Sequence, residues 1–355
     1  MNRESSVCVT HLIPYDGIGG VEIGARSMPT GIIGEFYFER TYLVQASDVT
    51  VRSDEYHGPK VSQNNPWAYL HAIRRLHRDP PDLLVASLWR SALVLMCLKL
   101  LQPKMKTVLF LHSAHDTHVF DKIANRIAMF ISDEIWADST VTLECRVPTR
   151  LCGKGRVVSF LLNHRPLPEW RDPKPHFIFW GRLSAQKGLD QALSFFASVL
   201  KQRQDAKFTI IGPDGGMESQ LRAQVAKLEM HDHVVFKGPM RHEDIAGEAS
   251  RAAFYLQTSL HEGMAMSVVE AMQNGLVPVV TPVGEIARYC HHKDSAIFVD
   301  EIDTAVEAVL DLLSKPHRYR RMSNAAASYW QTKPLYRDDF LRAAKELIES
   351  QEHAA

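Results

Sequence analysis

The sequence predicts an α/β protein of two domains, each built around a parallel sheet. The chain has 355 residues, which is more than one hydrophobic core usually organises. Short apolar segments alternate with longer amphipathic ones, a pattern typical of repeated strand–helix–strand units. Residues 162–174 contain three prolines without apolar periodicity, so they are predicted to form an interdomain linker.

The first domain is predicted to span residues 1–163. Its expected strands are residues 7–13, 36–45, 81–87, 107–112, 134–137 and 156–161, and its expected helices include residues 67–77 and 123–131. The helix after the first strand should have only about two turns, because Pro29, Gly31 and Gly34 interrupt it. The linker is placed at residues 164–174.

The second domain is predicted to span residues 175–334. Its expected strands are residues 177–180, 207–211, 233–237, 252–258 and 277–281, and helices are expected at residues 304–313, 317–329 and 335–350. In the last helix, apolar residues recur at helical spacing. We assign residues 335–355 separately from the second domain, as a C-terminal helix.

Charge and cysteine content exclude several classes of protein. The 41 lysines and arginines equal the 41 aspartates and glutamates, so no basic field argues for a nucleic-acid partner. The five cysteines are scattered without a CxxC pair, which favours reduced thiols over a disulfide frame or a zinc site. The N-terminus lacks the pattern of a signal peptide. We therefore expect a cytoplasmic protein.

One segment, residues 88–101, resembles a membrane helix. Arg90 and Lys99 interrupt it, and it is shorter than the roughly 20 apolar residues that span a bilayer. A spanning helix is therefore not expected. Its basic neighbours would suit peripheral contact with an anionic membrane face, but a core helix with charged ends is the favoured interpretation.

Two acids flank a predicted anion site in residues 261–285. Glu262 lies in the loop after the strand 252–258, and Glu270 lies on the next helix. Loops at the carboxyl ends of parallel strands hold ligands, and a helix N-terminus offers free N–H groups to an anion. The amides near Ser267 and Val268 should supply those groups.

Cations and glycines follow other strands. Arg182 and Lys187 bracket the glycine-containing loop 181–188, an arrangement that suits two adjacent phosphates. Gly212 and Gly238 follow the next two strands. Gly19 and Gly20 follow the first strand, where a dinucleotide fingerprint fails because Glu22 replaces its third glycine.

Together these residues carry a resemblance to a known family. Glu262-Gly263, Glu270-Ala271-Met272, Gly275 and Pro278-Val279-Val280 resemble the signature of glycosyltransferase family 4. The resemblance implies the GT-B fold, in which two Rossmann-like domains with parallel sheets face across a cleft and the last helix returns to the N-terminal domain. It also implies a nucleoside-diphosphate sugar, UDP- or GDP-linked, as donor.

The resemblance further implies roles for single residues. Arg182 and Lys187 would neutralise the diphosphate, Glu270 would bind the ribose, and Glu262 would face the donor sugar. Gly19 and Gly20 would face the diphosphate, and the loops at Gly212 and Gly238 would flank the base. His112, which ends the strand 107–112, would reach the donor sugar or the acceptor, with His115 and Asp116 as second choices.

Two positions depart from the family pattern. Met264-Ala265-Met266 stands where an aromatic residue and glycine are common, and His164 replaces the glycine that usually follows the asparagine at Asn163. The first departure alters the expected sugar pocket. The second puts the usual acceptor-side role of its loop in question.

The predicted function is a metal-independent, retaining hexosyltransferase. Its catalytic residues would be Glu262, His112, Arg182 and Lys187, and its acceptor a glycan or lipid-linked hydroxyl in cell-surface polysaccharide or lipopolysaccharide assembly. No Asp-x-Asp ends a predicted strand, so neither a metal nor another cofactor is expected. The alternatives are an epimerase or hydrolase of the same fold, and a catalytically idle relative that senses sugar nucleotides or acts as a scaffold.

Overall fold

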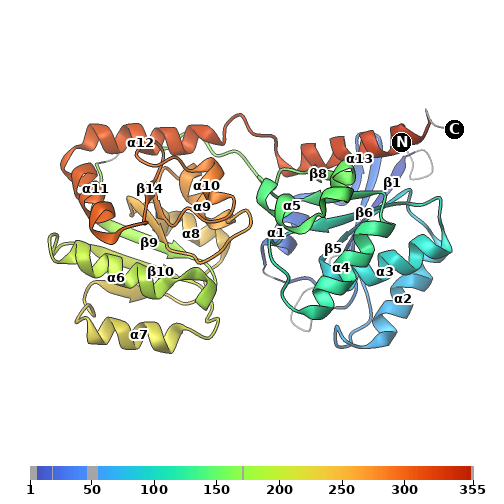
Figure 1. Ribbon diagram of the computed structural model, residues 1–355, viewed down its shortest axis with the longest axis horizontal. Coiled ribbons are helices and arrows are strands. Elements are labelled where there is room, and N and C mark those ends of the chain that lie inside the picture. Colours follow the sequence, from blue (N-terminus) through green and yellow to red (C-terminus); the bar gives the residue numbers. More distant parts are fainter. Residues whose placement is uncertain (1–5, 18, 46–54, 170–171, 353–355) are drawn as a thin grey trace. The chain divides into compact units, whose positions relative to one another are not determined.

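The structure, a computed structural model, describes residues 6–17, 19–45, 55–169 and 172–352. The chain divides into two compact units (Figure 1). Unit 1 comprises Met1–Asn163 together with Pro334–Ala355, and unit 2 comprises His164–Lys333.

Unit 1 is built on a mostly parallel sheet. Its strand order is β2-β3-β1-β5-β6-β7-β8, with β4 beside β3. The strands are β1 (Val7–Ile13), β2 (Gly31–Ile33), β3 (Phe36–Tyr42), β4 (Tyr56–His57), β5 (Leu83–Ser87), β6 (Lys106–Leu111), β7 (Glu134–Ala137) and β8 (Gly155–Val157). Only β2 pairs antiparallel among these described strands. A two-residue turn joins β2 to β3, and so short a connection can only reverse the chain direction.

The helices of unit 1 are α1 (Gly20–Ser27), α2 (Pro66–Arg78), α3 (Leu88–Leu101), α4 (Val119–Ile131), α5 (Thr140–Arg146) and α13 (Tyr336–Glu352), with a 3-10 turn at Thr149–Lys154. The two turns of α1 agree with the prediction from the sequence. Helix α3 buries Val94, Leu95 and Leu98, so the membrane-like segment is a core helix. Of the helices that the structure describes, none has the length and apolar character needed to cross a membrane.

Helix α13 completes the core of unit 1. Phe340 is fully buried, and its ring packs against His11, Phe38 and Trp136. The Asp339 carboxylate accepts a hydrogen bond from the Ser159 amide at 2.7 Å. The expected return of the last helix to the N-terminal domain is therefore confirmed.

Unit 2 is built on a fully parallel sheet with strand order β11-β10-β9-β12-β13-β14. The strands are β9 (His176–Trp180), β10 (Lys207–Ile211), β11 (Val234–Phe236), β12 (Phe254–Gln257), β13 (Val277–Val280) and β14 (Ile297–Phe298). The chain adds β10 and β11 on one side of β9, then crosses to β12 and continues outward. The topological switch point therefore lies between β9 and β12, where α/β sheets bind ligands.

Helices cover the sheet of unit 2 (Figure 1). They are α6 (Leu189–Leu200), α7 (Glu218–Lys227), α8 (His242–Ala249), α9 (Met266–Gln273), α10 (Ile286–Tyr289), α11 (Ile302–Ser314) and α12 (Pro316–Tyr329), with a 3-10 turn at Ala185–Lys187. The predicted strands are present but mostly shorter than predicted, because hydrogen-bonded pairing ends before the apolar pattern does.

Replacing Phe340 by alanine should destabilise unit 1 by about 3–5 kcal/mol, because the substitution leaves a cavity among buried rings. Urea unfolding followed by circular dichroism measures this loss. Arg337→Ala, on the exposed side of the same helix, is the control and should change stability by about 0.5 kcal/mol or less. Equal stabilities of the two variants would contradict the packing described for α13.

Candidate active site

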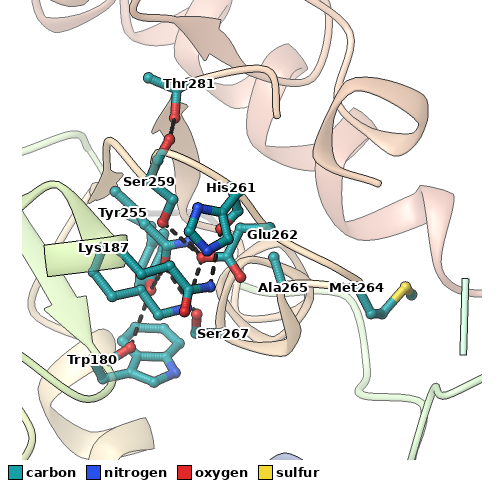
Figure 2. Close-up of polar contacts among 12 residues, drawn as sticks. Trp180, Lys187, Tyr255, Ser259, His261, Glu262, Met264, Ala265, Ser267 and Thr281 are labelled. Atoms are coloured by element: carbon teal, nitrogen blue, oxygen red, sulfur yellow. Dashed lines mark hydrogen bonds and ion pairs between the residues drawn. The ribbon is translucent and has the colours of Figure 1, made fainter. Parts of the chain in front are cut away.

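One predicted cation and one predicted acid of unit 2, Lys187 and Glu262, meet at the switch point. Strand β9 ends at Trp180 and leads into the loop that carries Lys187, and β12 ends at Gln257 just before Glu262. Because β9 and β12 are neighbours in the sheet, loops that are more than 70 residues apart in sequence leave the same edge. Figure 2 shows Lys187, Ser259 and Glu262 converging there.

Glu262 is the centre of this cluster. The residue is 6% exposed, and one carboxylate oxygen, Oε1, accepts hydrogen bonds from Lys187 Nζ at 2.6 Å, Ser259 Oγ at 2.6 Å and Gln257 Nε2 at 3.0 Å. A buried carboxylate needs such charged and polar donors to offset its desolvation. The three donors also fix the direction in which the carboxylate points.

Gln257 links Glu262 to the start of α9. Its side-chain oxygen lies 2.7 Å from the Tyr255 hydroxyl and 3.0 Å from the Ser267 hydroxyl. Since both hydroxyls donate to this oxygen, the amide nitrogen must be the atom that faces Glu262. Burial raises the pKa of Tyr255, so its hydroxyl remains a donor.

Two glycine turns hold the Glu262 loop in place. Gly188 has a φ of 59°, and a Cβ there would lie 2.0 Å from the Thr258 carbonyl oxygen. Gly284 has a φ of 58°, and its Cβ would lie 2.1 Å from the carbonyl oxygen of Glu262 itself. Only glycine combines this backbone conformation with so close an approach. The loop is thus packed between two backbone segments that no larger residue could form.

Glu270 lies on α9, beside the end of β9. Its carboxylate accepts a hydrogen bond from Trp180 Nε1 at 2.9 Å and lies 3.7 Å from His242 Nε2. Burial raises the pKa of Glu270, and the neighbouring His242 and the Trp180 hydrogen bond oppose that rise. The Trp180 carbonyl oxygen is 3.1 Å from the Tyr255 hydroxyl. Trp180 therefore connects the surroundings of both predicted acids.

Arg182 and Lys187 differ in their surroundings. Lys187 forms an ion pair with Glu262, whereas the Arg182 side chain is exposed. Within the described part of the chain, the Arg182 guanidinium has no acidic partner. Gly212 and Gly238 follow β10 and β11, and the Gly212 amide donates to the Gly238 carbonyl at 2.9 Å. The four predicted residues thus follow three adjacent strands of one sheet edge.

The start of α9 carries an unusual backbone conformation. Ala265 is the N-cap residue, with φ 55° and ψ 60°. The Val268 amide donates to the Ala265 carbonyl at 2.9 Å, so this predicted anion donor is already engaged. The Ser267 amide lies in the first turn, where N–H groups have no acceptor within the helix. Tyr289 donates its hydroxyl to the Met264 carbonyl at 3.0 Å and so fixes the preceding loop.

The predicted glycine turn of unit 1 lies at the start of α1. Gly19 is the N-cap residue of this helix and Gly20 its first residue. The carboxylate of Glu22, which is 4% exposed, folds back against the turn, and a Cβ on Gly19 would lie 2.4 Å from Glu22 Oε2. A side chain at position 19 would therefore displace the end of the Glu22 side chain.

His112 follows β6 and is a buried, neutral side chain. Its exposed fraction is 3%, and burial lowers its pKa to about 3. Its Nε2 lies 2.9 Å from Ser87 Oγ, which lies 2.8 Å from His11 Nε2. Burial also lowers the pKa of His11. His112, Ser87 and His11 thus form a row of neighbouring polar side chains. Because the His112 side chain is buried, a sugar could contact it only after local rearrangement.

The two second choices lie outside that row. His115 is exposed, and Asp116 forms an ion pair with Arg146 at 2.7 Å. Asp116 therefore contributes to a surface ion pair next to α5.

One group of potential metal ligands occurs among the described residues, formed by Asp16, Glu55 and His57. Asp16 is paired with Arg26, and Glu55 with Arg40. Because each carboxylate already faces a guanidinium, this group has much of its negative charge balanced.

Comparison with known proteins relates unit 2 to a known family. Residues 163–329 match the family model described as "Glycosyl transferases group 1". This part of the chain, slightly less than half of its residues, is therefore similar to the group 1 glycosyltransferases. Its limits nearly coincide with those of unit 2, so the matched family region contains Arg182, Lys187, Glu262 and Glu270.

Curated relatives of this glycosyltransferase region match over similar lengths. The GDP-mannose:cellobiosyl-diphosphopolyprenol alpha-mannosyltransferase of Xanthomonas oryzae pv. oryzae is 28% identical over 140 residues, which are 39% of this chain and 37% of that protein. The mannosylfructose-phosphate synthase of Agrobacterium fabrum is 27% identical over 149 residues, 40% of this chain and 32% of that protein. The aligned region thus spans less than half of each relative.

Solved structures extend the likeness to the whole fold. Sucrose-phosphate synthase from Thermosynechococcus elongatus aligns with a TM-score of 0.79 over 98% of this chain and 100% of that one, at 13% identity. Anabaena Alr3699/HepE in complex with UDP-glucose aligns with a TM-score of 0.72 over 98% and 99% of the two chains, at 14% identity. The chain therefore has the GT-B fold that the sequence predicts.

Three residues of the Glu262 cluster were not predicted from the sequence. Tyr255, Gln257 and Ser259 surround Glu262 but belong to a segment interpreted only as a strand and its end. A signal was present, because Gln257-Thr258-Ser259 places three polar residues after an apolar strand. Polar side chains at the carboxyl end of a central strand are favoured where a ligand site forms.

Replacing Ala265 by glycine should stabilise the protein by about 0.5–1 kcal/mol. Alanine is strained at positive φ, and relief of that strain exceeds the added flexibility of the unfolded chain. Urea unfolding compares the variant with the parent. Ala226→Gly, inside α7, is the matched control and should destabilise, because glycine is unfavourable within a helix. A loss of stability in Ala265→Gly would contradict the left-handed conformation.

The buried histidine predicts a pH dependence of stability. His112 has a lower pKa folded than unfolded, so below about pH 6.5 the unfolded state binds the extra proton and stability falls with pH. One such residue contributes a slope of about 1.4 kcal/mol per pH unit until its folded pKa is approached. Urea unfolding between pH 7 and about pH 5 should give a slope that is smaller by this amount in His112→Gln. Parallel profiles would show that His112 is not the titrating group.

Proposed function

We propose that this chain is a retaining glycosyltransferase that moves a hexosyl group from a UDP- or GDP-sugar to an acceptor hydroxyl. The observation that carries the proposal is the buried Lys187–Glu262 ion pair at the switch point of unit 2, with the exposed Arg182 on the same loop. The similarity of unit 2 to the group 1 family supports a transferase. The donor, the stereochemistry and the absence of a metal are our own inferences.

The cations suit a departing diphosphate. Arg182 presents an exposed guanidinium whose planar donors match phosphate oxygens. Lys187 has three N–H donors, and one of them contacts Glu262. The remaining donors can point at a phosphate while the ion pair fixes the ammonium group. Preorganised cations of this kind stabilise developing negative charge without reorganisation during the reaction.

The two glutamates suit the sugar parts of the donor. All three donors to Glu262 meet on Oε1, so Oε2 is the oxygen available to a hydroxyl of the donor sugar. Glu270 is oriented by Trp180 and would accept the ribose hydroxyls. Its raised pKa would fall on binding, because hydrogen bonds from hydroxyls favour the ionised carboxylate.

We infer that transfer occurs on the face from which the diphosphate departs, with no covalent intermediate on the protein. Glu262 is held by three donors, which lower the nucleophilicity that a double-displacement mechanism needs. We also infer that Arg182 and Lys187 supply the positive charge that a divalent metal supplies in other phosphate-departing reactions. A metal or other cofactor would then be unnecessary.

For the acceptor we propose a lipid-linked glycan of cell-surface polysaccharide or lipopolysaccharide assembly, reached in the cytoplasm at the inner membrane face. Relatives support this class: the Xanthomonas enzyme is named for a diphosphopolyprenol acceptor and a Streptococcus pneumoniae relative for monoglucosyldiacylglycerol synthesis. The second candidate function is that of a catalytically idle relative that binds sugar nucleotides without turnover. The buried ring of His112 and the presence of Ala265 in the segment Met264-Ala265-Met266 favour it.

Calorimetric titration with UDP and GDP tests the donor site. One nucleotide should bind the parent protein, and Arg182→Ala should weaken that binding by about 10–100-fold, since a charge-assisted contact contributes about 1.5–3 kcal/mol. The control is Arg251→Ala, another exposed arginine of unit 2, and it should leave affinity unchanged. Equal affinities of the parent and Arg182→Ala would remove Arg182 from the site.

A second assay separates the candidate functions. The protein is incubated with sugars linked to whichever nucleotide binds, with and without a membrane lipid extract as the source of acceptor. Acceptor-dependent release of nucleotide that persists in EDTA would support metal-independent transfer. Turnover without acceptor would indicate an epimerase or hydrolase. Nucleotide binding without any turnover would indicate the idle relative.

A further inference from the structure

Helix α4 exposes an apolar face on unit 1. Five large apolar side chains of this helix are between 42% and 73% exposed: Val119, Phe120, Ile123, Ile127 and Phe130. Val119 and Phe120 are adjacent, and the other three follow at spacings of three or four residues, which places all five on one side of the helix within an arc of about 100°. The opposite side, which includes Ala124, Ala128 and Met129, is buried. We call the exposed set the α4 stripe.

The charges beside the α4 stripe are basic. Lys122 and Arg126 are exposed and follow its edge, and within the described residues neither pairs with an acid. Asp121, the single acid of the helix, is buried and accepts hydrogen bonds from Thr117 and Asn125. The guanidinium of Arg150 lies 4.6 Å from the Phe130 ring. One edge of the α4 stripe thus carries two exposed cations of the helix, and a third cation lies over the Phe130 ring.

A pocket of about 130 Å³ adjoins the same edge. Lys122 and Arg126 line it from α4, and Arg146 lines it from α5. Asp116 also lines the pocket and is paired with Arg146 at 2.7 Å. The charges of Asp116 and Arg146 cancel, so Lys122 and Arg126 give the pocket a net positive charge. A singly charged phosphate of a lipid headgroup has the complementary charge.

We propose that the α4 stripe lies in the surface of an anionic membrane, with a lipid phosphate in the adjoining pocket. Helices that bind in the plane of a bilayer combine an apolar face with basic residues at its borders. Each basic residue near an anionic surface adds about 1 kcal/mol of attraction. This inference rests on the proposed function, because membrane binding would bring the enzyme to its lipid-linked acceptor. Binding to vesicles can nevertheless be measured without donor or acceptor.

Charge favours the membrane over a second copy of the chain as the occupant. A two-fold interface through the α4 stripe would bring the same surface of two copies together. Lys122, Arg126 and Arg150 would then face equivalent cations, and like charges across an interface are unfavourable. An anionic bilayer presents the opposite charge to these three cations.

The α4 stripe is not the segment for which the sequence suggested membrane contact. Residues 88–101 form α3, whose cations are engaged within unit 1: Lys99 pairs with Asp133 at 2.7 Å, and Arg90 donates to Asn64 at 2.8 Å. The exposed large apolar residues of α3 are Leu100 and Leu101, at the end of the helix. Helix α4 instead exposes apolar residues along its whole length.

Co-sedimentation with phosphatidylcholine vesicles, with and without phosphatidylglycerol, tests the proposal on the full chain. The parent protein should bind the vesicles that contain phosphatidylglycerol, and less so at high salt. Phe120→Gln/Ile123→Gln and Lys122→Glu/Arg126→Glu should each bind them at least roughly tenfold more weakly, since each removes one of the two attractions. The controls are Leu228→Gln/Val235→Gln and Lys201→Glu/Lys227→Glu, which change exposed residues of unit 2 and should bind like the parent.

Nucleotide titration of the same variants separates this proposal from the proposed function. The α4 variants should bind UDP or GDP like the parent, and urea unfolding followed by circular dichroism should show that unit 1 remains folded in them. Vesicle binding that survives both α4 variants, or is absent from the parent, would overturn the membrane assignment whatever the nucleotide result. Sedimentation velocity checks the remaining occupant: a parent dimer that Phe120→Gln/Ile123→Gln converts to monomer would make the α4 stripe a subunit interface.

Discussion

The buried charge of Glu262 is the constraint on which the site in unit 2 depends. A carboxylate that is 6% exposed requires partners, and removing one side of a buried ion pair costs about 3–5 kcal/mol. Lys187 comes from the loop after β9, whereas Gln257 and Ser259 come from the end of β12 and the residues after it. The carboxylate therefore fixes the loops of two neighbouring strands against each other.

Backbone packing makes that arrangement rigid. Gly188 and Gly284 allow contacts with the Glu262 loop that a Cβ would prevent, so the loop has little freedom to relax if a side chain is lost. Ala265 is strained in the same region, since an L-residue with a side chain rarely adopts its backbone conformation. Strain of this kind persists where surrounding contacts enforce it, and the Tyr289 hydrogen bond to the Met264 carbonyl is one such contact.

The two units use polar groups differently. In unit 2, charged side chains gather around the switch point, and one exposed guanidinium, that of Arg182, remains available to an anion. In unit 1, the His11–Ser87–His112 row is buried and uncharged at neutral pH, surrounded by aromatic rings such as Phe110 and Phe160. Unit 1 instead has exposed cations at its surface along α4, Lys122 and Arg126.

The sequence by itself determined the alternation of strands and helices, and its resemblance to a known family indicated the GT-B fold. The strand–loop order also predicted that Lys187 and Glu262 would lie at one edge of a sheet. Apolar periodicity and strand–loop spacing are local properties, and parallel strands place their carboxyl ends together. Tertiary structure alone decided that Gln257 and Ser259 hold Glu262, that His112 is buried, and that α4 exposes the apolar face while α3 is covered. Burial depends on which elements pack over a residue. Those elements come from distant parts of the sequence, so a local sequence pattern does not predict it.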